Sequence, residues 1–122
     1  MANDGLYQPN VPQLLQSGVT ATGNGGVLLI KGACSQVTVV LQGTGTTSGG
    51  AVIIEEGFYD PNGDDYSGTW SALSTVNAST FSGPGGVNQV IARMAGSYWA
   101  LRVRVSSTIT GGGTISVWAW AN

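Results

Sequence analysis

The sequence predicts an all-β domain: an antiparallel β-sandwich of the jelly-roll type with about eight strands, preceded by an extended arm. The 20 glycines of this 122-residue chain gather in clusters, and between them lie short runs rich in valine, isoleucine, leucine and tryptophan. Such clusters are typical of turns between strands. No segment shows a helical period, and several runs alternate apolar and polar residues as half-buried strands do. Strands with one apolar face need two packed sheets or, as a second choice, a closed barrel.

The first 16 residues are predicted to form the arm, and residues 17–122 the sandwich domain. The arm contains Pro9 and Pro12 and shows no alternation. A disordered leader is the alternative. Because many of its residues are apolar, unlike those of most disordered segments, we expect the arm to lie on a neighbouring subunit. The arm residues expected in that interface are Leu6, Tyr7, Val11 and Leu14.

Turn signals place the strands that follow. Glycine-rich segments such as 43–50 and 110–113 end one apolar run and precede the next. The runs 27–30 and 52–54 are apolar on both faces, so we expect the second sheet, a long loop or another subunit to cover them. The predicted strands are residues 17–22, 27–32, 36–42, 51–57, 69–75, 87–95, 97–106 and 114–121.

The run from 98 to 105 alternates clearly, so its two faces can be assigned. One face carries Arg102 and Arg104, which we expect to meet solvent or a carboxylate. If they are exposed, replacing both by threonine should change stability by no more than ~1 kcal/mol. The opposite face, expected in the core, consists of Trp99, Leu101, Val103 and Val105.

The last run, 114–121, alternates as well but leaves two alternatives. Trp118 and Trp120 share one face, and the smaller residues from Ile115 to Ala121 share the other. Either the tryptophans form the core, or they are exposed on a surface with little charge, as in a subunit contact or a ligand platform. We place both tryptophans in a subunit interface.

Charge is scarce, which excludes several classes of function. Only 8% of the residues are charged, against roughly 25% in ordinary soluble domains. Four cations form no basic stripe, so neither nucleic-acid nor membrane binding is expected. The chain has no histidine, and its single cysteine, Cys34, is expected as a small buried side chain. Without the commonest general base and the usual metal ligands, we expect no enzymatic activity, no cofactor and no metal.

The acidic segment 60–65 partly matches a calcium loop. Its first, third and fifth residues carry oxygen, but Asp65 and Ser71 stand where a glycine and a bidentate glutamate are required. A turn held by its own side chains is the better interpretation. Glu55 and Glu56 could add ligands or could end an exposed strand. A glycosidase pair is not expected, because a glycine-flanked acidic loop does not bury one carboxyl to raise its pKa.

The order of motifs resembles β-sandwich domains of tailed-bacteriophage virion proteins. The similar segments are VTVVLQGT at 37–44, AVIIEEG at 51–57, GTWSALS at 68–74 and AGSYWALRVRV at 95–105, followed by 111–117. Trp70 and the Arg-Val-Arg element are the distinctive parts, and the resemblance covers about residues 35–121. The chain departs from the pattern by its arm and by the lack of a large second domain.

This resemblance implies a structural protein of the virion, assembled in a bacterial cytoplasm. A sandwich with little charge and an extended arm suits a repeated subunit whose surface is partly buried in an assembly. We therefore expect a capsid decoration, or cement, protein that binds the outside of a phage head as a homotrimer, with the major capsid protein or another virion protein as its partner. A tail, baseplate or fibre module is the first alternative. A carbohydrate-binding jelly roll with exposed tryptophans is the second.

Overall fold

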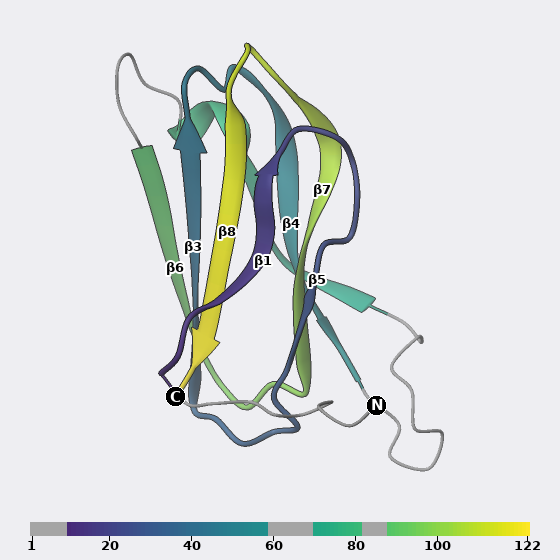
Figure 1. Ribbon diagram of the computed structural model, residues 1–122. Helices are drawn as coiled ribbons and strands as arrows, with labels where there is room; N and C mark the ends of the chain where they lie inside the picture. The colour runs from purple at the N-terminus through teal and green to yellow at the C-terminus, as the bar shows by residue number, and fades with distance from the viewer. Residues whose placement is uncertain (1–9, 59–69, 82–87) are drawn as a thin grey trace.

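The computed structural model describes residues 10–58, 70–81 and 88–122 and confirms the predicted fold class (Figure 1). Within these ranges, two four-stranded antiparallel sheets pack face to face. The strands are β1 (Gln13–Val19), β2 (Val27–Leu29), β3 (Gln36–Thr44), β4 (Gly49–Gly57), β5 (Trp70–Asn77), β6 (Asn88–Ala95), β7 (Ala100–Thr110) and β8 (Thr114–Ala121), with a short 3-10 helix η1 (Ala78–Phe81) after β5.

The strand order is that of a jelly roll. One sheet has the order β1-β8-β3-β6 and the other the order β2-β7-β4-β5. Apart from the β4–β5 pair, each strand is followed in the chain by a strand of the opposite sheet, as two interleaved Greek keys require. Within the described ranges, no helix has the length and apolarity that a membrane span needs.

The core lies between the two sheets and consists of alternate residues from their inner faces. Val37, Val39 and Leu41 of β3 are fully buried, and so are Leu101 and Val103 of β7. The buried residues thus follow the same two-residue alternation that the apolar residues show in the sequence. Cys34 is half-buried against the same core.

Trp99 is the exception to the expected core face. It precedes β7 and packs with a second, smaller cluster on the outer face of the β2-β7-β4-β5 sheet, around Leu29, Ala100 and Trp70. The alternation therefore ends where β7 begins. The second cluster also explains why the run 27–30 is apolar on both faces, because it covers the outer side of Leu29.

The boundary of the predicted arm is wrong by four residues. Residues 13–16 belong to β1, which pairs with β8, and Leu15 is packed in the core. Two register irregularities, between Leu14 and Gln16 and between Gln16 and Val19, remove the alternation that would mark a strand. A truncation that tests the arm must therefore end before Gln13.

The turn before β8 packs closely on the β3–β4 connection and gives a first stability prediction. The buried Gly113 donates its N–H to the Thr46 carbonyl at 2.7 Å, and a Cβ on Gly113 would meet the carbonyl oxygens of Thr44 and Thr46. We expect Gly113→Ala to lower the free energy of unfolding by about 1 to 3 kcal/mol, measured by denaturant titration. Gly23→Ala is the control, because nothing lies within 4 Å of its Cβ position. Equal losses in both variants would contradict this account.

Candidate functional site

The outer face of the β1-β8-β3-β6 sheet carries both tryptophans of β8. The alternate residues Ile115, Val117 and Ala119 are 0% exposed in the core, so Trp118 and Trp120 point to the opposite side, where both are partly exposed. The alternative in which the tryptophans form the core is therefore wrong.

An apolar row crosses all four strands of this face. Trp118 lies opposite Leu14 of β1 on one side and opposite Val40 of β3 on the other, and Val40 lies opposite Ile91 of β6. The two ends of the row are open to solvent, since Leu14 is 51% and Ile91 is 44% exposed. We call Leu14, Trp118, Val40 and Ile91 the apolar row.

A second row of residues paired across the strands lies beside the apolar row. Trp120 lies opposite Thr38, which lies opposite Arg93. Thr38 is on the outer face yet only 3% exposed, so its neighbours cover it. Arg93 is the only charged residue on the four described strands of this sheet. The face is thus almost uncharged, and the apolar row crosses it between polar, uncharged side chains.

The other residues predicted for the interface are only partly described. Val11 is 43% exposed and lies just before β1. The adjacent Asn10 donates its N–H to the Ala121 carbonyl at 2.9 Å, so the chain enters β1 beside the end of β8. Leu6 and Tyr7 lie outside the described residues, as does the acidic segment 60–65.

The outer face of the second sheet has a different character, because it holds a charged cluster. Arg102 donates from Nε to Glu55 Oε1 at 2.8 Å, and Arg104 donates from Nη2 to Oε2 at 3.1 Å. The Arg102 guanidinium also stacks on the Trp70 ring, 4.2 Å from its centroid. The prediction that both arginines lie on an outer face and meet a carboxylate is confirmed.

Glu55 is the central group of this cluster and is only 5% exposed. Burial raises the pKa of Glu55, but the hydrogen bonds and charges of Arg104 and Arg102 outweigh that effect, and the net pKa lies below its ordinary value. Both carboxylate oxygens are engaged by arginines. Glu55 is therefore neither a free metal ligand nor part of an exposed strand end.

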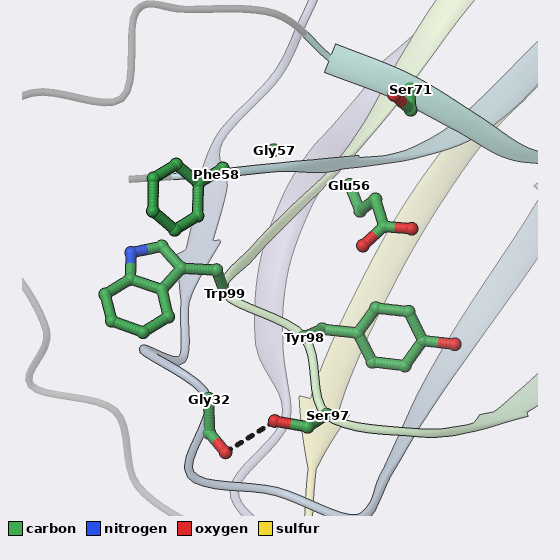
Figure 2. Close-up of a pocket in the computed structure, with 8 residues that line it drawn as sticks. All are labelled: Gly32, Glu56, Gly57, Phe58, Ser71, Ser97, Tyr98 and Trp99. Atoms are coloured by element: carbon green, nitrogen blue, oxygen red, sulfur yellow. Dashed lines mark hydrogen bonds between the residues drawn. The ribbon is translucent and has the colours of Figure 1, made fainter. Parts of the chain in front are cut away.

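A pocket opens at one end of the sandwich, where four separate segments meet (Figure 2). Its volume is about 360 Å³. The rings of Phe58 and Trp99 lie on one side of the close-up, and Glu56, Ser71 and Tyr98 lie on the other. The lining residues are Gly32, Glu56, Gly57, Phe58, Ser71, Ser97, Tyr98 and Trp99.

One wall of the pocket is held by a tight turn after β2. Lys31 and Gly32 both have left-handed backbones, with φ of 60° and 79°. The N–H groups of Ile30 and Lys31 both donate to the Trp99 carbonyl, and that of Gly32 donates to the Tyr98 carbonyl. Sequence reasoning missed this site because its residues come from four segments that are separated in the chain. The glycine at position 32, a turn signal after an apolar run, is the one local mark of its wall.

Comparison with known proteins supports the fold. No protein-family model matches the chain, and no curated protein matches its sequence. Among solved structures, the SPBc2 prophage-derived protein YomS aligns with a TM-score of 0.54 at 12% identity, over 89% of this chain and 90% of that one. A carbohydrate-binding module specific for non-crystalline cellulose, CBM28, aligns with a TM-score of 0.43 at 12% identity, over 88% and 76% of the two chains. The likeness to YomS shows a shared fold.

Proposed function

We propose that this protein is a non-enzymatic structural subunit of a tailed-phage virion, a decoration protein that binds the outer surface of the head. The observation that carries the proposal is the apolar row. A continuous apolar surface with a single neighbouring charge is unfavourable in water and typically marks a protein contact. The prophage origin of YomS and the resemblance of the Arg-Val-Arg strand to phage sandwich domains both support a place in a virion.

The surface that covers the apolar row is, we propose, a neighbouring copy of the same chain in a homotrimer. Trp118 lies inside the row with aliphatic side chains on both sides, which is the composition of an interface hot spot. Since Arg93 is the only charge on these strands, contact between copies need not bring many like charges together. Trp118 and Trp120 are only partly exposed, so their open parts supply, together with the half-exposed Leu14 and Ile91, a share of the ~800 Å² that each partner buries in a standard interface.

The location is tested on the virion itself. We expect cryo-electron microscopy of purified particles, with the protein identified by mass spectrometry, to show trimers on the outside of the head. Density only at the tail or baseplate would replace the head assignment by the tail alternative. Absence of the protein from purified virions would contradict both.

A further inference from the structure

We propose that the pocket at the end of the sandwich binds one neutral sugar residue of a glycan. This site is distinct from the apolar row, because it is built from the other sheet and the loops next to it. Its volume of about 360 Å³ lies at the small end of the ~300 to 1,000 Å³ found for ligand pockets. A sugar ring needs two things there: a flat apolar surface for its C–H groups and hydrogen-bonding groups for its hydroxyls.

The apolar surface is provided by Trp99 and Phe58. Their ring centroids are 5.6 Å apart with an angle of 40° between the planes, and both rings lie on the same side of the pocket (Figure 2). Phe58 is 66% exposed, so this surface is open to a ligand. The C–H face of a pyranose packs on aromatic rings of this kind.

The polar groups lie on the other side. The carboxylate of Glu56, the hydroxyl of Ser71 and the ring of Tyr98 are grouped there (Figure 2). Burial and the charge of Glu56 raise the pKa of Tyr98, so its phenol keeps the proton that it donates to the Ala95 carbonyl at 3.0 Å. A carboxylate can accept hydrogen bonds from two neighbouring hydroxyls, and hydrogen bonds to charged groups are the stronger ones.

The arrangement of the rings favours a sugar over an organic cation. An aromatic cage surrounds a quaternary ammonium with several ring faces. Here Phe58 and Trp99 pack against each other, and Tyr98 points away from Trp99 (Figure 2). Among the described residues that line the pocket, Glu56 is the only charged one, and its carboxylate would repel acidic sugars.

The pocket wall is also set before any ligand arrives. Ser97 donates from Oγ to the Gly32 carbonyl at 2.8 Å, and three backbone hydrogen bonds join residues 30–32 to Tyr98 and Trp99. Lys31 keeps a left-handed backbone, a conformation rarely adopted outside glycine and often found at functional sites. A fixed wall lowers the ordering cost of binding.

The test is a printed array of neutral and sialylated oligosaccharides, probed with the full chain, followed by titration of the best neutral glycan and of phosphocholine. We expect binding to neutral glycans. We expect Trp99→Ala to reduce binding to background and Glu56→Gln to weaken it about tenfold. Glu56→Gln keeps the shape of the side chain, so it remains informative if Trp99→Ala fails to fold.

Thr75→Ala is the matched control, because Thr75 is exposed on β5, does not line the pocket and should leave the binding unchanged. An array without any bound neutral glycan would overturn the proposal, and so would binding of phosphocholine or sialylated glycans alone. Binding that survives Trp99→Ala and Glu56→Gln but is lost in Trp118→Ala would also overturn it, in favour of a glycan platform on β8.

Discussion

Replacing Trp118 and Trp120 together by alanine is expected to give a folded monomer. Both side chains lie on an outer face, while the core beneath them is made by Ile115, Val117 and the alanines of β8. The change therefore removes contact area without opening a core cavity. Anchor residues of an interface each contribute about 2 to 4 kcal/mol, so losing two raises the dissociation constant about 1,000-fold or more.

Light scattering coupled to size-exclusion chromatography and circular dichroism measure the two parts of this prediction. The native chain should be a trimer at micromolar concentration, and the variant a monomer with the same β-sheet spectrum. Ile53→Ala is the control, because Ile53 belongs to β4 in the opposite sheet and is expected to leave the trimer intact. A trimeric variant, or a native chain that is already monomeric, would contradict the proposed contact. An unfolded variant would contradict the outward placement of the rings.

Strand positions could be predicted from the sequence because glycine clusters and a period of two are local signals. The orientation of β8 could not. Alternation separates Trp118 and Trp120 from Ile115 and Val117, but it does not say which set faces inward. That choice depends on the opposite sheet, which supplies Leu101, Ile54 and other large residues to the core and leaves room for the alanines of β8.

The partners of the charged residues also depend on three-dimensional pairing. Glu55 and Glu56 are adjacent in sequence, yet Glu55 joins Arg102 and Arg104 on the outer face while Glu56 lines the pocket. Neighbouring residues of a strand point to opposite faces, so alternation alone separates the two glutamates. The pairing of β4 with β7 places Glu55 opposite Arg102, and a local sequence pattern does not show that pairing. Because Glu55 contacts both arginines, losing them should cost more than the sequence-based estimate for exposed residues.

Replacing Arg102 and Arg104 together by threonine is expected to lower the free energy of unfolding by about 3 kcal/mol at pH 7. This exceeds the ~1 kcal/mol that applies to exposed pairs. The Glu55 side chain is only 7% exposed in the native protein, so the variant would leave its charge in a partly buried site without either of its cations. The estimate lies at the lower end for buried pairs because the Arg104 side chain is 34% exposed and solvent already screens part of its interaction.

The pH dependence provides the decisive measurement. In the native protein the pKa of Glu55 is below its ordinary value of 4.5, so the ion pairs stabilise the fold above that pH and this contribution is lost as the pH falls through the folded-state pKa. In the variant, burial without cations raises the pKa of Glu55, so acid relieves the penalty. Denaturant titrations should therefore show the largest difference between the two proteins at pH 7. The difference should begin to shrink above pH ~4.5, where the variant regains stability, and shrink further below it, where the native protein loses the ion pairs. Adding Glu55→Gln should recover most of the loss at pH 7, whereas Arg93→Thr on the opposite sheet should cost no more than ~0.5 kcal/mol. A loss below ~1 kcal/mol at pH 7 that does not change with pH would show that solvent, not the arginines, balances the charge of Glu55.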